Sequence, residues 1–349
     1  MEGFKSQKVL VVGGAGFVGS NLVKMILQSF PKEVIVVDNL LSAEKENLPE
    51  NPALTFVEGS ITNDSILDSL PTDLDYVFHL ATYHGNQSSI HDPLADHENN
   101  TLTTLKLYEK IKNFSNLKKV VYSSAGCTVA EKTFDTAKAT TEDDPVSLYL
   151  DSPYQISKII GEFYSNYYLR QHGLPVVKAR FQNVYGPGEV LGAGQWRGTP
   201  ATIWRNVTPT FVYRSLKNMP LTVENGGIAT RDFIYVDDIA RGLMLCATRG
   251  IAGGVYNLAS GVETTILELA TLINQITGTS TPIDYRPKRN WDNSGKRFGS
   301  TDKAKQELGF ETQVDLSKGL EQTVLWTKQH IDFIDACISK HKPYMSSLN

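Results

Sequence analysis

A tyrosine and a lysine one helical turn apart are well suited to proton transfer. In the run Asp-Ser-Pro-Tyr-Gln-Ile-Ser-Lys, Ser152 can cap a helix and Pro153 suits its first turn. Tyr154 and Lys158 then share one helix face, and an ammonium group beside a phenol favours the phenolate. We therefore expect the pKa of Tyr154 to fall from about 10 towards neutrality, so that the phenolate can accept a hydroxyl proton while a hydride leaves the same carbon. Because this spacing often arises by chance, its meaning depends on a cofactor site elsewhere in the chain.

A glycine-rich turn that follows the first expected strand supplies such a site. Lys8 is followed by four apolar residues, 9–12, and the chain continues Gly-Gly-Ala-Gly-Phe-Val-Gly. Gly13 permits a tight turn, Gly16 lets the backbone approach a pyrophosphate, and Gly19 lets the following helix pack closely on the strand. Asp38 ends the second strand, where its carboxylate can bind both ribose hydroxyls and would repel a 2′-phosphate. The sequence therefore predicts a dinucleotide site that takes NAD rather than NADP.

The elements that must position these residues alternate between strand and helix. Short β-rich runs read as buried strands at residues 8–12, 34–37, 54–57, 76–79, 120–122 and 176–181. Helical patterns lie between them, for example at residues 18–26 and 102–111. This alternation predicts the α/β class, with a doubly wound parallel sheet (Rossmann) covered by helices on both faces.

After about residue 185 the alternation stops. Residues 192–209 are rich in Gly, Trp, Arg and Thr and are a poor candidate for regular core, whereas helices are expected at 237–247, 265–277 and 316–338, before a frayed tail at 344–349. We expect an NAD-binding Rossmann domain over residues 1–182, with a return segment near 228–248. Residues 183–349 would mainly form a smaller C-terminal substrate-binding lobe, with the ligand cleft between the two parts.

Composition limits the possible partners and surroundings. The chain has 349 residues, 41% of them hydrophobic, and a net charge of −4, which argues against nucleic acid as a partner. No apolar run approaches the roughly 18 residues of a membrane span, so we expect no membrane partner. Three distant cysteines without a Cys-x-x-Cys motif argue against a disulfide scaffold or a metal site, and favour a cytoplasmic location.

Further motifs follow in order along the chain: GGAGFVGSN, VVDNL, His79-Leu80-Ala81, Asn100, YSSAGC, the Tyr154 and Lys158 pair, NVYGPG from Asn183, RDFIYVDD from Arg231, and Arg297 ahead of Lys303-Ala304. With this series the chain resembles the nucleotide-sugar epimerase/dehydratase family of extended short-chain dehydrogenases/reductases, of which UDP-galactose 4-epimerase is a familiar member. It is most similar, over nearly its whole length, to the epimerase/dehydratases encoded in bacterial O-antigen clusters.

The resemblance implies roles for individual residues. Asp38 and Asn39 would hold the adenosine ribose, Ile61 the adenine, and Ala81 and Asn100 the inner half of NAD. The expected NAD site is completed by Gly13, Gly16, Phe17, Val18, Gly19, Ser60, Leu80, Thr82, Tyr154 and Lys158, although the family usually has Asp where Ser60 stands. For the substrate, Ser89 (four residues before Pro93, as in the family) would face the sugar, and Asn183, Arg231 and Arg297 would grip the nucleotide diphosphate.

The end of the fifth expected strand departs from the family pattern. Its run is Ser-Ser-Ala-Gly-Cys-Thr, so Ala125 stands where a Ser or Thr usually helps to polarise the reacting sugar oxygen. Either Ser124 or Thr128 substitutes, or the helper is dispensed with. Cys127 lies where 4,6-dehydratases carry Glu and 3,5-epimerases carry Cys. It either fills a strand end as a small buried thiol, the commoner fate of cysteine, or moves a proton beside a keto group.

These features lead to one preferred function and two alternatives. We expect an NAD-dependent epimerase that transiently oxidises C4 of an NDP-hexose, with UDP as the expected nucleotide, for surface polysaccharide (O-antigen) synthesis. Its catalytic candidates are Tyr154, Lys158, Ser124 and Cys127. The alternatives are C3/C5 epimerisation or dehydration using Cys127, and a non-catalytic NAD-binding regulator that would not need Tyr154 or Lys158. The resemblance further implies a homodimer paired through a four-helix bundle, to which Ile159, Ile160 and Phe163 would contribute.

Overall fold

A seven-stranded parallel sheet forms the centre of the molecule. The computed structural model describes residues 2–129, 133–289 and 295–346. The strands lie in the order β11-β7-β5-β4-β1-β2-β3, and every neighbouring pair is parallel. Their bounds are β1 Lys8–Val12, β2 Glu33–Asp38, β3 Leu54–Glu58, β4 Tyr76–His79, β5 Lys119–Ala125, β7 Val176–Phe181 and β11 Val255–Leu258. The prediction of a doubly wound α/β fold is confirmed, as are its six strands.

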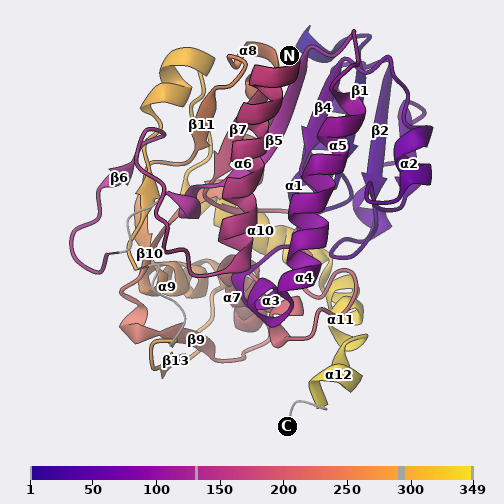
Figure 1. Ribbon diagram of the computed structural model, residues 1–349. Helices are drawn as coiled ribbons and strands as arrows, with labels where there is room; N and C mark the ends of the chain where they lie inside the picture. Colours follow the sequence, from indigo (N-terminus) through magenta and orange to yellow (C-terminus); the bar gives the residue numbers. More distant parts are fainter. Residues whose placement is uncertain (1, 130–132, 290–294, 347–349) are drawn as a thin grey trace.

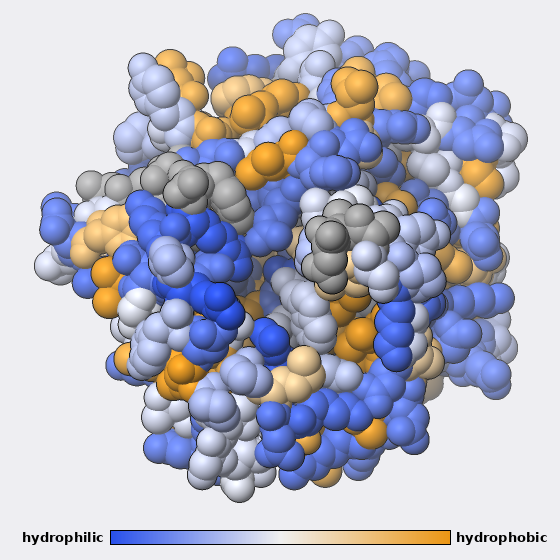
Figure 2. Space-filling view, turned by 90° about the horizontal axis from the view of Figure 1, so that it is seen from below, coloured by the Kyte–Doolittle hydropathy of each residue, from blue (hydrophilic) through white to orange (hydrophobic). Residues whose placement is uncertain are grey.

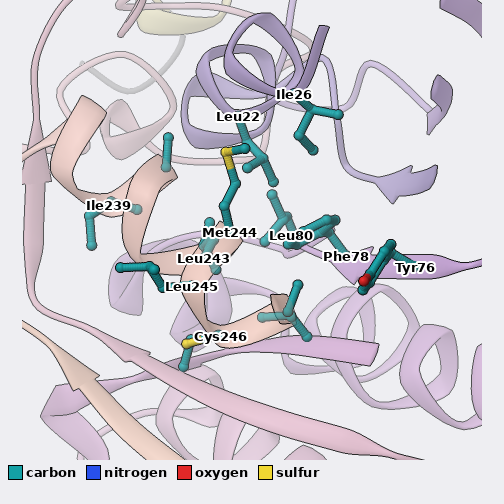
Figure 3. Close-up of a cluster of buried hydrophobic side chains, with 14 of the residues drawn as sticks. Leu22, Ile26, Tyr76, Phe78, Leu80, Ile239, Leu243, Met244, Leu245 and Cys246 are labelled. Atoms are coloured by element: carbon teal, nitrogen blue, oxygen red, sulfur yellow. The ribbon is translucent and has the colours of Figure 1, made fainter. Parts of the chain in front are cut away.

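Helices cover both faces of this sheet. In Figure 1, α5 (Thr103–Ile111) and α6 (Pro153–His172) cross the front of the sheet. On the other face, α1 (Phe17–Leu27) packs against α8 (Val236–Arg249). Figure 3 shows the buried cluster there, in which Leu22 of α1 approaches Leu243 and Met244 of α8. This burial of apolar side chains stabilises that face of the sheet.

Two features of this core were not foreseen. The seventh strand, β11, pairs with β7 although it has only four residues, which follow two glycines and include Asn257. The segment expected as one helix at 316–338 is two helices, α10 (Leu316–Gln329) and α11 (Ile331–Ser339). His330, with φ −114° and ψ 18°, breaks the helix between them.

The remaining elements form a lobe below the sheet in Figure 1. Its strands are β8 (Asn183–Tyr185), β9 (Leu221–Glu224), β10 (Thr230–Tyr235), β12 (Glu263–Thr265) and β13 (Ile283–Arg286), and β6 (Ala139–Thr140) pairs with β14 (Phe298–Gly299). Its helices are α7 (Val207–Leu216), α9 (Ile266–Thr277), α10, α11 and α12 (Lys342–Ser346). Short helices α2 (Asp64–Ser69), α3 (Asn86–His91) and α4 (Pro93–Asp96) belong to the sheet domain.

The irregular stretch at 192–209 is packed rather than loose. It contains one 3-10 turn, Pro200–Thr202, before α7 begins, yet Ala193, Ala201 and Ile203 are buried. Trp196 stacks on Tyr344 with ring centroids 5.4 Å apart. The expected frayed tail is therefore wrong for residues 344–346, which belong to α12, and residues 347–349 lie outside the described part of the chain. Within the described ranges, no helix is both long and apolar enough to cross a membrane.

Candidate active site

One cavity of about 650 Å³ runs from the carboxyl ends of the central strands into the lobe. Figure 2 shows the lobe side of the molecule, where a central hollow is bordered by both hydrophilic and hydrophobic residues. The predicted cofactor residues that line the cavity are Gly13, Gly16, Phe17, Val18, Gly19, Asp38, Asn39, Ser60, Ile61, Leu80, Ala81, Thr82, Tyr154 and Lys158. Ligands of open α/β sheets bind at this end of the strands, beside the point where the strand order reverses.

The glycine turn leaves the start of α1 open towards the cavity. Gly13 has φ +81°, and a side chain there would collide with the backbone of Ala81. A side chain at Gly19 would collide with the carbonyl oxygen of Gly13. No side chain caps α1 at Gly16, so the first N–H groups of the helix remain available and its dipole favours negative charge. This arrangement suits a phosphate group.

Asp38 joins the glycine turn to the loop that follows β2. Its Oδ2 accepts a hydrogen bond from the N–H of Ala15 at 3.0 Å, and its Oδ1 accepts one from the N–H of Leu40 at 2.9 Å. Burial raises the pKa of Asp38, and these backbone hydrogen bonds oppose that rise. A carboxylate has about four acceptor positions, so lone pairs remain for ribose hydroxyls.

Asn100 does not line the cavity, contrary to the expectation that it faces the cofactor. It is buried, and its Oδ1 accepts hydrogen bonds from Thr82 Oγ1 at 3.0 Å and from the N–H of Tyr83 at 2.6 Å. Its Nδ2 donates to Asp96 and Ser157. Both polar atoms of the Asn100 side chain are therefore bound within the protein. Asn100 fixes the loop after β4 without itself facing the cavity.

Tyr154 and Lys158 meet in the cavity from the first turns of α6. The helix begins as predicted: Ser152 Oγ accepts from the N–H of Gln155 and Pro153 occupies the first turn. Lys158 Nζ lies 5.9 Å from the centroid of the Tyr154 ring and donates to the carbonyl oxygen of Ser123 at 2.9 Å. Burial lowers the pKa of Lys158 to about 8.

The expected fall in the pKa of Tyr154 is wrong for the protein groups taken alone. Burial raises this pKa, and negative charge on Cys127 and Asp96 adds to the rise, while Arg297 opposes it. The ammonium group of Lys158 is engaged by Ser123 instead of lying against the phenol oxygen. Desolvation therefore outweighs the attraction on which the sequence argument relied.

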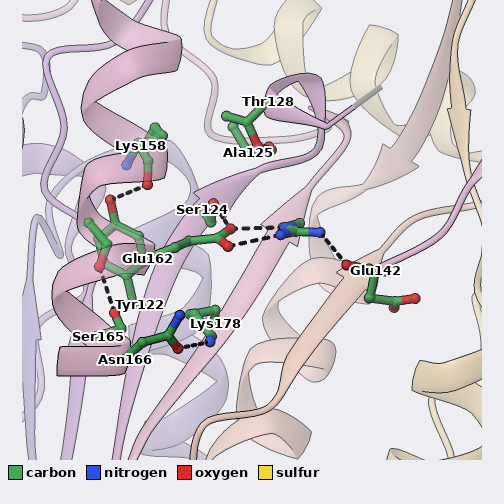
Figure 4. A network of polar contacts seen from close by, with 12 residues as sticks. Tyr122, Ser124, Ala125, Thr128, Glu142, Lys158, Glu162, Ser165, Asn166 and Lys178 are labelled. Atoms are coloured by element: carbon green, nitrogen blue, oxygen red, sulfur yellow. Dashed lines mark hydrogen bonds and ion pairs between the residues drawn. The ribbon is translucent and has the colours of Figure 1, made fainter. Parts of the chain in front are cut away.

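Neither hydroxyl proposed to replace the one missing at Ala125 is free to do so (Figure 4). Ser124 Oγ donates to Glu162 Oε1 at 2.5 Å, and Glu162 forms a buried ion pair with Arg180 at 2.9 Å. Thr128 Oγ1 donates to the carbonyl oxygen of Ala125 at 2.7 Å. Ser124 thus borders the cavity, but its hydroxyl proton is donated to the buried Glu162–Arg180 ion pair. This arrangement differs from the catalytic role expected for Ser124.

Cys127 is a partly exposed free thiol that lines the cavity. Tyr154 and Lys158 line the same cavity. Among the described residues Cys127 forms no side-chain hydrogen bond.

The predicted substrate residues divide into two groups. Asn183, Arg231 and Arg297 line the lobe side of the cavity; Arg231 Nη1 donates to the carbonyl of Gly295 at 2.7 Å, and Arg297 has a buried Nε without a partner in the described chain. Ser89 differs from the expectation, because it is fully buried and does not line the cavity. Its Oγ accepts the N–H of Tyr154 at 3.1 Å, so it fixes the start of α6 instead of facing a sugar.

Several cavity residues were missed by the sequence analysis. His84 lies with its ring centroid 5.9 Å from that of Tyr154, and burial lowers its pKa to about 3. Burial raises the pKa of Glu189 to about 7, and Arg205 stands near it. The richness of residues 192–209 in Arg and Trp was the available signal for Arg205, since such residues are typical of binding sites as well as of irregular structure.

Comparison with known proteins identifies the family. The profile of the NAD dependent epimerase/dehydratase family matches residues 9–259. The chain belongs to this family. Its cofactor is NAD, and the uncapped start of α1 and the Asp38 carboxylate fit that dinucleotide.

Members of the epimerase/dehydratase family resemble this chain over most of its length. It is 62% identical to the Bordetella bronchiseptica enzyme WbmF, crystallised with NAD+ and UDP, with 99% of both chains covered and a TM-score of 0.90. It is 32% identical to the UDP-glucose 4-epimerase of Thermotoga maritima, crystallised with UDP-glucose, with 93% of this chain and 99% of that one covered and a TM-score of 0.82. A dTDP-glucose 4,6-dehydratase of Streptomyces antibioticus is 28% identical over 330 residues, 92% of each chain. Membership therefore establishes an enzyme of nucleotide-sugar epimerase/dehydratase type without specifying the reaction.

Proposed function

We propose that this protein is a UDP-sugar 4-epimerase, which oxidises C4 of a UDP-hexose transiently and re-reduces it with inversion. The observation that carries the proposal is the position of Tyr154 and Lys158, which share one cavity with the glycine turn and Asp38 on one side and with Arg231 and Arg297 on the other. The UDP bound by WbmF and the UDP-glucose bound by the Thermotoga epimerase support the choice of nucleotide.

The chain's own residues would divide the work as follows. NAD, when bound, accepts a hydride from the sugar carbon and supplies it again. Tyr154 takes the proton of the C4 hydroxyl and later returns it. Because burial raises the pKa of Tyr154 in the protein alone, the positive charge of the bound nicotinamide would join that of Lys158 in favouring the phenolate. Asn183, Arg231 and Arg297 hold the diphosphate, to which guanidinium groups are well matched. We assign NAD binding to residues 1–182 with a return segment near 228–248, and nucleotide-sugar binding mainly to residues 183–349.

The proposal is tested by incubating the purified protein with UDP-glucose, UDP-N-acetylglucosamine, UDP-glucuronate, dTDP-glucose and GDP-mannose, and following each sugar by NMR. We expect at least one UDP-sugar to equilibrate with its C4 epimer without net formation of NADH. Loss of the C6 oxygen from any of these sugars, with no C4 inversion, would replace the epimerase proposal with a dehydratase.

Inversion at C3 or C5 is the second candidate, and one observation favours it. Ala125 offers no hydroxyl and the hydroxyls of Ser124 and Thr128 are bound elsewhere, whereas the Cys127 thiol lines the same cavity as Tyr154. A keto group at C4 acidifies the C–H bonds at C3 and C5, so the Cys127 thiol could remove a proton from one of these carbons and return it. We rank it second because a thiol at a strand end commonly serves packing.

We further propose a homodimeric enzyme of the cytoplasm that serves surface polysaccharide synthesis. The three cysteines are free, as in a reducing compartment. On α6, Ile156, Phe163 and Tyr167 are 46%, 59% and 52% exposed on one face, which supports pairing through this helix. Ile159, expected at the contact, is only 6% exposed and packs inside. Phe163→Glu should convert a dimer to a monomer in light scattering, and a monomeric unmodified protein would contradict the assignment.

A further inference from the structure

Arg205 is a cation in the cavity wall that forms no ion pair with a carboxylate of the described residues. Its Nη1 donates to the carbonyl oxygen of Ser42 at 3.3 Å, and its Nη2 donates to Ser42 and Val190 at 3.4 Å each. These distances lie beyond the usual range for N–H···O bonds, and no carboxylate of a described residue forms an ion pair with it. Burial lowers the pKa of Arg205, while the charge of nearby Glu189 opposes that effect. A desolvated guanidinium of this kind costs free energy unless a ligand anion accompanies it.

A second guanidinium reinforces the positive charge at this point. Arg197 is 4% exposed, and its Nη1 reaches the carbonyl of Leu41 at 3.5 Å. Its Nε and Nη2 are buried without a partner among the described residues. Burial and then the charge of Arg205 lower the pKa of Arg197 to about 9. Two cations thus lie against the successive carbonyls of Leu41 and Ser42.

The elements around Arg205 belong to the cofactor half of the cavity. Leu41 and Ser42 follow β2 and line the cavity beside Asp38. Val190 follows a segment fastened to α1, in which the carbonyl of Pro187 accepts a hydrogen bond from Asn21 Nδ2 at 3.0 Å. Arg205 therefore reaches from the lobe to the space between the start of α1 and the loop after β2. In a doubly wound fold the pyrophosphate of a dinucleotide binds at the start of that helix.

We propose that Arg205, reinforced by Arg197, neutralises the pyrophosphate of bound NAD from the lobe side. The glycine turn of α1 offers backbone N–H groups but no side-chain cation, and Arg205 supplies the missing charge. The lobe then closes over the cofactor as well as holding the sugar, which keeps NAD in place between turnovers. This inference concerns cofactor retention, so it does not depend on which sugar carbon is inverted.

The rate of cofactor release tests the proposal directly. Protein loaded with NADH is mixed with a large excess of NAD, and the loss of bound NADH is followed by its fluorescence. We expect Arg205→Met to accelerate release on the order of tenfold or more, because it removes a charged hydrogen bond, and Arg205→Lys to fall between. Arg170→Met, which removes an exposed guanidinium at the far end of α6, is the matched control and should leave the rate unchanged.

Fragments of the cofactor identify the occupant. Arg205→Met should weaken direct binding of ADP-ribose, which carries a pyrophosphate, and leave direct binding of adenosine unchanged, both measured by calorimetry on protein freed of its nucleotide. An equal loss for both ligands would show a disturbed loop at Leu41 and Ser42 and overturn the assignment. An unchanged NADH release rate would also overturn it. If, in that case, binding of UDP-glucuronate weakened while binding of UDP-glucose did not, the anion at Arg205 would be an acidic group on the sugar.

Discussion

The two halves of the cavity are built from different material. The cofactor half consists mainly of backbone at the ends of β1, β2 and β4, where glycines and the start of α1 present N–H groups. The substrate half consists of side chains, with Arg231 on β10 and Arg297 on an irregular segment. A site made of backbone is specified by a short run of sequence, whereas a site made of side chains depends on how distant segments pack.

The largest effect is expected where the two halves meet, at Tyr154. Tyr154→Phe removes the proton acceptor and keeps the ring, so turnover of the UDP-sugar should fall by about 100-fold or more. Turnover is measured by NMR on the substrate identified in the panel. Because Tyr154 belongs to neither half alone, the variant should keep its bound NAD and its melting temperature.

Tyr149→Phe is the matched control for this change, since Tyr149 is 87% exposed just before α6. Full activity in Tyr154→Phe would contradict the proposed proton transfer. It would also contradict the idea that the two halves of the cavity act together at Tyr154.

The cofactor half was largely predictable because its signals are local. The glycine turn, Asp38 and the capped start of α6 each occupy a few consecutive residues, and backbone geometry follows directly from them. Ser89 and Asn100 lie in motifs of the same kind, but the direction of their side chains could not be read in this way. Both turn inward to bind backbone or buried groups, which only the packed protein determines.

The substrate half and the charges were less predictable for the same reason. Arg205 lies in a stretch without periodicity, so no pattern indicated that its guanidinium would meet the carbonyl of Ser42, far away in the sequence. The pKa of Tyr154 was misjudged because a helical spacing gives proximity to Lys158 but not the degree of burial. Strand β11 was missed because a four-residue strand acquires its identity from its neighbour β7.

The next effect is expected at Asp38, and it should be confined to the cofactor half. Asp38→Ala removes the ribose acceptor together with two hydrogen bonds to backbone N–H groups, so NAD should bind about ten- to a hundredfold more weakly. The preference for NAD over NADP should also shrink, since the carboxylate no longer repels a 2′-phosphate. Both affinities are measured by titration calorimetry.

Asp68→Ala removes an exposed carboxylate paired with Lys110 and serves as the control for Asp38→Ala. Tighter binding of NADP than NAD by the unmodified protein would contradict the role given to Asp38.

A smaller effect is expected in the substrate half, because its charges are shared. Arg231→Met should weaken UDP binding by about tenfold, since Arg297 remains in the same wall of the cavity. Retention of NAD should not change, which distinguishes this arginine from Arg205. Arg286→Met on the exposed edge of β13 is the control, and equal losses of UDP and NAD would show that the two halves are not separable.

The smallest effect is expected at Cys127, although this residue decides between the two epimerase mechanisms. Inversion at C4 breaks one C–H bond, and its hydrogen returns to the same carbon from the cofactor, so a 4-epimerase working in D₂O leaves no deuterium on carbon. Inversion at C3 or C5 passes through an enol, and the proton that returns to carbon comes from a side chain that exchanges with solvent. Cys127→Ser should then suppress the uptake, because a serine hydroxyl is a far poorer proton donor and acceptor than a thiol. We expect no deuterium on carbon and near-normal turnover in Cys127→Ser, in keeping with a packing role; uptake at C3 or C5 that disappears in this variant would instead give the substrate half a catalytic thiol.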